Sequence, residues 1–218
     1  CLAELDALLR KVADDSSAYP GDIHVVFVGD LVDRGPDSAG VLRRLREGPI
    51  PGGRHAFLMG NHEEAMIGIW DGDLESLGGW LTYGGVETLQ SYGLGRGEIF
   101  RLGTDLPRRM REVVPPEDIA FMRGFEDQVR IGDYLFVHAG IRPGIPLAEQ
   151  DQYDLRWIRS EFLDDEETNH GVMVVHGHTI TAEPDVRSNR IGIDTGCFAS
   201  GHLTALVLEG TDRRFIST

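Results

Sequence analysis

The sequence predicts an α/β fold in which strands alternate with helices and carry polar side chains at their carboxyl ends. Apolar stretches rich in β-branched and aromatic residues, typical of buried strands, occupy 23–28, 55–60, 134–138 and 172–176. Each stretch ends in carboxylate, carboxamide or imidazole groups. In an open α/β sheet the carboxyl ends of the strands lie at an edge where ligands bind. These polar groups are therefore expected to meet when the chain folds.

Helices are predicted from apolar residues at helical spacing and from helix-start signals. Leucines three and four residues apart predict an amphipathic helix that begins near Leu2 and ends near the polar loop at 14–17. Pro36 opens a second helix that continues to about Glu47. A further helix is expected over 154–162.

The second half of the sequence predicts a hairpin and closing strands. Gly132 and Asp133 separate two apolar stretches, and such a Gly-Asp pair is typical of a tight β-turn. We expect the hairpin strands at 126–131 and 133–138, and later strands at 190–196, 202–210 and 213–218.

The stretch 29–35, GDLVDRG, gives the strongest chemical signal. Asp30 lies at the tip of the first strand, Asp33 adds a second carboxylate, and Arg34 supplies a guanidinium shaped for two-pronged phosphate binding. The other strand ends carry Asn61, His62, His138 and His178. Oxygen and imidazole ligands suit Mn²⁺, Fe²⁺ or Zn²⁺. Because these residues are far apart in sequence, only the folded chain can bring them to one metal site.

The motifs GDLVDRG at 29–35, GNHE at 60–63, HAG at 138–140 and GHT at 177–179, in this order, carry a resemblance to a known family. The sequence resembles the phosphoprotein phosphatase branch of the calcineurin-like metallophosphoesterases, in particular its short bacterial and phage members. The resemblance implies a sandwich of two mixed β-sheets flanked by helices, with the active site at the carboxyl ends of the strands. It also implies two divalent metal ions, with Mn²⁺ favoured over Fe²⁺ or Zn²⁺.

The resemblance also implies a role for each site residue. Asp30 would bridge the two metal ions, and the second metal site would be completed by Asn61, His138 and His178. His62 would be the general acid that protonates the leaving group, with Asp33 holding its imidazole and raising its pKa.

Two arginines would bind the phosphoryl oxygens, namely Arg34 and Arg159. Arg156 lies close enough to Arg159 to be an alternative, and either arginine could instead form a surface ion pair. His176 is interpreted as a strand residue or a neighbour of the site, and Asp194 as a structural residue.

One motif of the family is not found at its usual place. In relatives a Gly-Asp-x-His-Gly strand end, which supplies ligands of the first metal, precedes the helix that begins here after Cys1. We therefore expect that the first strand is missing from this chain and that the first metal site is incomplete. Asp22 and His24 imitate the motif, but at about 3.3 Å per residue a strand places Asp22 roughly 20 Å or more from Asp30.

Length and composition favour one domain, 1–218. Within the helical and loop-rich segment 66–125, the stretch GWLTYGGVETLQSYG at 79–93 resembles a segment common in bacterial members of the family, and this resemblance implies a cap-like insertion beside the site. The formal net charge of −15 argues against nucleic acid and anionic membranes as partners, because both are bound through basic surfaces. Two cysteines make no disulfide framework, and no apolar stretch approaches the length of a membrane span. A cytoplasmic location is expected.

Three functions are compatible with these motifs. The leading prediction is a serine/threonine protein phosphatase, with phosphotyrosine as an additional substrate and a phosphoprotein or phosphopeptide as partner. The alternative is a bis(5'-nucleosyl)-tetraphosphatase. The resemblance implies an alanine at the position of Asp33 in that subgroup, so Asp33 favours the phosphatase. A third possibility is a phosphate-binding module whose catalysis is impaired by the missing ligands.

Overall fold

The strand that leads into GDLVDRG pairs with the next strand along the chain. In the computed structural model, which describes residues 1–17, 19 and 21–218, β1 (His24–Phe27) is parallel to β2 (Arg54–Phe57). The register pairs His24 with Arg54 and Phe27 with Phe57. Since parallel strands end at the same edge, the loop after β1 lies beside the residues that follow β2.

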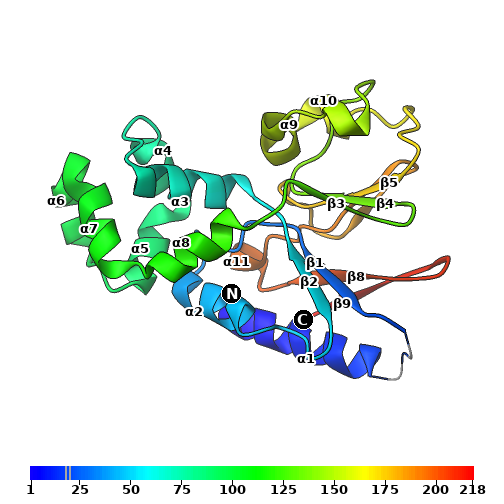
Figure 1. Ribbon diagram of the computed structural model, residues 1–218, viewed down its shortest axis with the longest axis horizontal. Helices are drawn as coiled ribbons and strands as arrows, with labels where there is room; N and C mark the ends of the chain where they lie inside the picture. The colour runs from blue at the N-terminus through cyan, green and yellow to red at the C-terminus, as the bar shows by residue number, and fades with distance from the viewer. Residues whose placement is uncertain (18, 20) are drawn as a thin grey trace.

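A mixed five-stranded sheet forms the other half of the fold (Figure 1). Its strands, in spatial order, are β3 (Gln128–Ile131), β4 (Tyr134–Val137), β5 (Met173–His176), β7 (Arg190–Gly192) and β6 (Asp185–Val186). The strands β4, β5 and β7 are parallel, and the edge strands β3 and β6 are antiparallel to their neighbours. The predicted hairpin at Gly132–Asp133 is confirmed, whereas β6 was not predicted and β7 is shorter than expected.

The chain closes with the hairpin β8 (Thr204–Glu209) and β9 (Asp212–Ser217). The strands are thus divided among a parallel pair, a five-stranded sheet and a hairpin, rather than between two sheets. The expected α/β class with a mixed sheet flanked by helices is confirmed.

Two amphipathic helices pack on the β1–β2 pair. They are α1 (Leu2–Ser16) and α2 (Ser38–Arg46), both close to their predicted bounds. Their apolar faces form one core, which includes Leu5, Leu9, Val41, Leu45 and Ile50 and against which Phe27 and Phe57 pack. Asp37 caps α2, accepting a hydrogen bond of 2.8 Å from the backbone N–H of Gly40.

The segment between β2 and β3 is almost entirely helical and forms a lobe at one end of the molecule (Figure 1). Its elements are α3 (Asn61–Asp71), α4 (Leu77–Trp80), the π-helical turn η1 (Leu81–Gly85), α5 (Val86–Ser91), α6 (Arg96–Leu102), η2 (Gly103–Asp105), α7 (Leu106–Val113) and α8 (Pro116–Arg123). The lobe has its own core, in which Met66, Ile69, Leu89, Leu106 and Met110 are fully buried.

Short helices cover the five-stranded sheet. These are η3 (Leu147–Glu149), α9 (Gln152–Trp157) and α10 (Ser160–Leu163), and α11 (Cys197–Ser200) follows β7. The single helix predicted over 154–162 is interrupted, because Ile158 and Arg159 leave helical geometry. The break lets Leu155, Ile158 and Phe162 all pack into the core under the sheet. Among the described residues, no helix has the length and apolar character that a bilayer crossing requires.

Candidate active site

The four predicted metal ligands converge at the carboxyl ends of β1, β2, β4 and β5. Asn61 Oδ1 lies 3.1 Å from His138 Nε2 and 2.9 Å from His178 Nδ1. His138 Nε2 in turn lies 3.2 Å from His178 Nδ1 and 3.3 Å from an Asp30 carboxylate oxygen. Residues separated by up to 148 positions in sequence (Asp30 and His178) therefore meet within one small volume.

The orientation of these groups fits a cation. His138 Nδ1 lies 2.6 Å from the carbonyl oxygen of Val28, and donation to that oxygen leaves the Nε2 lone pair facing the cluster. Asp30 Oδ1 is buried, has no hydrogen-bond partner among the described residues, and lies 3.3 Å from His138 Nε2. Buried acceptors that face one another are costly unless a positive charge joins them. The oxygen and nitrogen donor set therefore suits a borderline divalent ion.

The charges of the cluster agree with this geometry. Burial raises the pKa of Asp30, but the neighbouring imidazoles, His138 above all, outweigh burial and hold the pKa below its ordinary value. Burial, with a smaller contribution from His138, lowers the pKa of His178 to about 3. The carboxylate is thus ionised and the imidazole neutral, which are the forms that bind metals.

The backbone is strained at this site. Within the part of the chain that the structure describes, the non-glycine residues with positive φ are Asp30 (56°), Asp33 (72°), Arg34 (61°) and His178 (63°). Such conformations are uncommon for residues with a side chain and persist where the surroundings hold them. At Gly84 (φ 124°), a Cβ atom would collide with the backbone nitrogen of Arg34. The helical lobe therefore approaches the GDLVDRG loop through a position that only glycine fits.

Glu63 holds the loop in this conformation. Its carboxylate, fully buried, accepts hydrogen bonds from the backbone N–H groups of Asp30 (2.9 Å), Leu31 (2.7 Å), Val32 (3.1 Å) and Gly60 (3.0 Å). Sequence reasoning assigned no role to Glu63. Its position in GNHE, three residues into α3 after Gly60, is a helix-capping signal that could have identified it.

His62 and Asp33 form a buried pair beside the cluster. His62 Nδ1 lies 2.7 Å from Asp33 Oδ2, and the carboxylate also accepts hydrogen bonds from Trp80 Nε1 (2.9 Å) and Thr88 Oγ1 (2.7 Å). Burial lowers the pKa of His62, but the hydrogen bond to Asp33 and the charges of Asp30 and Asp33 raise it more, so the net shift is upward. Trp80 and Thr88 were not predicted to contact the site.

Arg34 lies next to this pair and lines a cleft that is also bordered by Asp30, His62 and His178. Its Nε donates to the carbonyl oxygen of Tyr83 at 3.3 Å, and its guanidinium lies 4.9 Å from the ring centroid of Phe198. The terminal nitrogens of Arg34 make no hydrogen bond to the described residues. These two contacts therefore fix the guanidinium group, and its two terminal nitrogens are available to bind an anion.

The two candidate arginines near α9 differ in their contacts. Arg156 forms ion pairs of 2.6 Å with Glu64 and with Asp127. Arg159 is exposed, and its Nη1 donates only to Thr179 Oγ1, at 3.3 Å, among the described residues. Arg156 is thus occupied by carboxylates, and Arg159 is the better placed of the two to meet an anion.

Other histidines and acids lie outside the cluster. His176 is buried, its Nδ1 lies 3.0 Å from the carbonyl oxygen of Gly177, and burial lowers its pKa to about 4. Burial also raises the pKa of Asp194, which accepts a hydrogen bond of 2.9 Å from the N–H of Gly196. Asp22, two residues before β1, is exposed and pairs with Arg54 at 3.4 Å.

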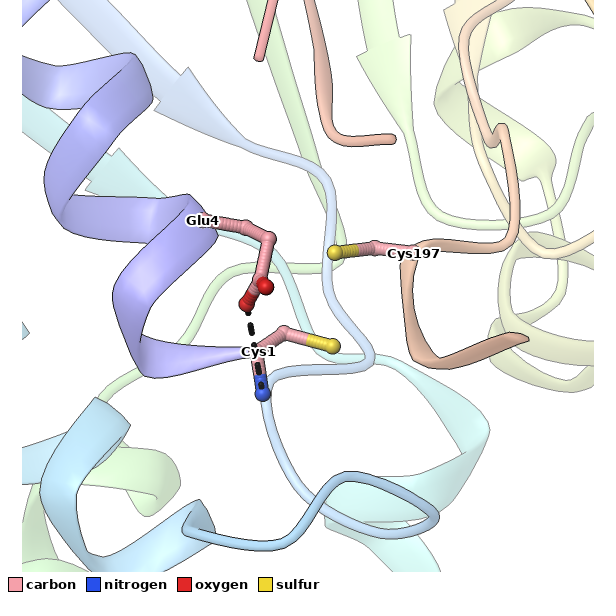
Figure 2. A group of neighbouring side chains, drawn as sticks. All are labelled: Cys1, Glu4 and Cys197. Carbon is pink, nitrogen blue, oxygen red and sulfur yellow. Dashed lines mark ion pairs between the residues drawn. The ribbon is translucent and has the colours of Figure 1, made fainter. Parts of the chain in front are cut away.

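A second group of metal-ligating side chains lies between α1 and α11. Figure 2 shows Cys1, Glu4 and Cys197 together, and their sulfur and carboxylate atoms lie within 4.8 Å of one another. Burial raises the pKa of the Cys197 thiol. This group is distinct from the cluster around Asp30.

Comparisons with known proteins cover nearly the whole chain. Residues 1–202 match the family described as calcineurin-like phosphoesterase. The chain is 26% identical over 223 residues to the asymmetrical bis(5'-nucleosyl)-tetraphosphatase PrpE of Bacillus velezensis, covering 94% of this chain and 83% of the relative. It is 27% identical over 265 residues to the symmetrical bis(5'-nucleosyl)-tetraphosphatase of a Janthinobacterium species, covering 99% and 91%.

A solved structure agrees with the fold. The crystal structure of a candidate diadenosine tetraphosphatase aligns with 100% of this chain and 88% of its own at a TM-score of 0.66, with 23% sequence identity. This similarity confirms the predicted metallophosphoesterase fold.

The comparisons contradict the leading functional prediction. The relatives are named as nucleosyl tetraphosphatases, so the predicted protein phosphatase activity and the predicted phosphoprotein partner are wrong. The prediction rested on the resemblance to the phosphoprotein phosphatase branch and on Asp33 as a marker against the alternative. In the structure Asp33 is buried and contacts His62, Trp80 and Thr88, so it reports how the histidine is held and not which substrate binds.

The shared chemistry of the predictions is unaffected, because hydrolysis of a phosphoester or phosphoanhydride needs the same gathered ligands. Phosphoesterases of this fold use divalent metal ions, and the residues around Asp30 fit one. Since the family match extends over 1–202, the chain belongs to the calcineurin-like phosphoesterases and is a metal-dependent hydrolase.

Proposed function

We propose that this protein hydrolyses bis(5'-nucleosyl) tetraphosphates by cleaving a phosphoanhydride bond in the tetraphosphate chain. The observation that carries the proposal is the gathering of Asp30, Asn61, His138 and His178 beside the His62–Asp33 pair. The names of the relatives supply the substrate class.

Asp30, Asn61, His138 and His178 would hold the divalent cation. When bound, a divalent cation neutralises charge on the phosphoryl oxygens and makes water a better nucleophile. Mn²⁺ is the proposed ion, and Fe²⁺ and Zn²⁺ suit the same donor set.

The protein's own residues position the phosphate chain and supply the proton. Arg34 and Arg159 bind phosphoryl oxygens, and the fixed guanidinium of Arg34 loses little conformational freedom when it does so. A water oxygen attacks one phosphorus atom while the bond from that phosphorus to the bridging oxygen breaks. His62 donates a proton to the departing oxygen from Nε2, because Asp33 occupies Nδ1 and favours the protonated ring.

The test is product analysis. Protein loaded with Mn²⁺ is incubated with diadenosine tetraphosphate, and the products are separated by anion-exchange chromatography. Cleavage at the centre yields ADP alone, whereas cleavage off centre yields AMP with ATP. Asp30→Asn, prepared in parallel, should lose the activity and so exclude a contaminating hydrolase. A folded, metal-loaded protein that releases neither product set contradicts the proposal.

A further inference from the structure

Helix α9 presents two aromatic side chains next to the active site. Tyr153 is 67% exposed and Trp157 is 36% exposed. The two residues are four positions apart, so they share one side of the helix. Their rings are nearly parallel, with an interplanar angle of 13° and centroids 6.3 Å apart. Together they make a small apolar surface, here called the α9 aromatic surface.

This surface adjoins both the metal cluster and a candidate phosphate ligand. The Trp157 ring lies 6.5 Å from the ring of His178, at an interplanar angle of 75°. Arg159 follows two residues later and reaches Thr179, the residue after His178. One short segment therefore offers an aromatic face and an exposed guanidinium side by side.

A hydrogen bond and the ion pairs next to it hold the indole ring of Trp157 in place. Trp157 Nε1 donates to Glu64 Oε2 at 2.6 Å, and the other oxygen of Glu64 pairs with Arg156 at 2.6 Å. Arg156 also pairs with Asp127 at 2.6 Å. Glu64 lies in α3, two residues after His62, so this network ties the ring to the helix that carries the proton donor. A ring fixed in advance loses less entropy when a ligand stacks on it.

We propose that the α9 aromatic surface is a stacking site for one nucleobase of the substrate. This inference rests on the proposed function, because a dinucleoside tetraphosphate carries a nucleoside at each end of its phosphate chain. With the phosphates near His178 and Arg159, one nucleoside extends over α9. Stacking accepts any base, since every base has a π-face. The surface therefore selects nucleotides over inorganic polyphosphate without strong preference among bases.

The experiment compares two probes in equilibrium binding to Mn²⁺-loaded protein. One probe is a methylene-bridged diadenosine tetraphosphate that resists hydrolysis, and the other is inorganic tetraphosphate, which has no base. The variants are Trp157→Ala, Tyr153→Ala and Trp157→Phe. Phe100→Ala is the matched control, because Phe100 is 57% exposed, has Arg96 at 5.5 Å from its ring, and lies on α6 in the helical lobe (Figure 1).

We expect Trp157→Ala to raise the Kd for the dinucleotide analogue about 5- to 150-fold, the range that loss of one base–aromatic stack produces. Tyr153→Ala should raise it less, Trp157→Phe should retain most of the affinity, and Phe100→Ala should not change it. The Kd for inorganic tetraphosphate should stay the same in all variants. Trp157→Phe keeps an aromatic ring, so its result separates lost stacking from lost folding.

Several results would overturn the stacking site. The first is a Trp157→Ala variant that binds the analogue with wild-type affinity. The second is a Trp157→Ala variant that loses affinity for inorganic tetraphosphate to the same extent, which indicates that His178 is disturbed. A wild-type protein that binds the analogue no better than inorganic tetraphosphate is the third. Because binding is measured without turnover, Trp157-dependent binding by a protein that cleaves no tetraphosphate would reject the proposed function alone.

Discussion

At the scale of single residues, Asp33 and His62 work as one unit. Three donors, from His62, Trp80 and Thr88, fix the Asp33 carboxylate in a buried position. A carboxylate held in this way orients the imidazole and favours its protonated form. We expect chemistry and positioning to be divided between the two residues, because the His62 side chain keeps 6% exposure while the Asp33 side chain is fully buried.

This division predicts the effect of changing His62. We expect His62→Asn to lower kcat for diadenosine tetraphosphate by about 10²- to 10⁴-fold, the usual contribution of a positioned proton donor. KM should change little, because the metal ligands and Arg34 are intact. Steady-state kinetics gives both parameters, and metal analysis checks that the neighbouring Asn61 still binds. An unchanged kcat would show that His62 does not supply the proton.

At the scale of elements, Glu63 joins the GDLVDRG loop to the start of α3. The Glu63 carboxylate accepts hydrogen bonds from backbone N–H groups of both segments, and both of its oxygens take part. No other side chain of this length has two acceptor oxygens. In Glu63→Gln the new amide group faces N–H donors, so buried donors lose their partners. Each such loss costs about 1–3 kcal/mol.

We therefore expect Glu63→Gln to reduce the free energy of unfolding by roughly 2–4 kcal/mol and to weaken metal binding, because Asp30 is no longer held. Urea denaturation measures the first effect and metal titration the second. Glu117→Gln is the control, since the Glu117 side chain is 59% exposed and should change stability by less than about 0.5 kcal/mol. Equal stability of the two variants would contradict the structural role of Glu63.

The difference between local signals and contacts across long sequence distances explains how much of the fold and of the site the sequence could predict. The strands and the residues at their ends were identifiable, because apolar stretches and the motifs after them are local signals. Trp80 and Thr88 were missed because they lie 47 and 55 positions from Asp33 in the sequence, and no local pattern encodes contacts over such separations. The interruption of the helix at Ile158 is set by packing under the sheet, which periodicity does not report. Substrate class was mispredicted from Asp33, whose carboxylate is fully buried and pairs with His62.

At the scale of the whole molecule, the cluster proposed to bind metal connects the two halves of the fold. Asp30 and Asn61 follow the β1–β2 pair, whereas His138 and His178 follow strands of the five-stranded sheet. The unfolded chain cannot gather these ligands. A cation bound by them therefore stabilises the native state according to the ratio of its concentration to its Kd.

Removing metal should accordingly lower the thermal midpoint. At a metal concentration near 100 times the Kd the stabilisation is about 2.7 kcal/mol, which for a chain of this length corresponds to roughly 5–11 °C. Calorimetry with Mn²⁺, then with chelator, then with Mn²⁺ restored measures this shift and its reversal.

The surface is acidic, with a formal net charge of −15, so cations could also stabilise the protein by binding to it non-specifically. His178→Ala separates the two effects, because it removes one ligand and leaves the surface charge unchanged. If the Mn²⁺-dependent shift persists in this variant, the stabilisation comes from the surface and not from the site that unites the two halves.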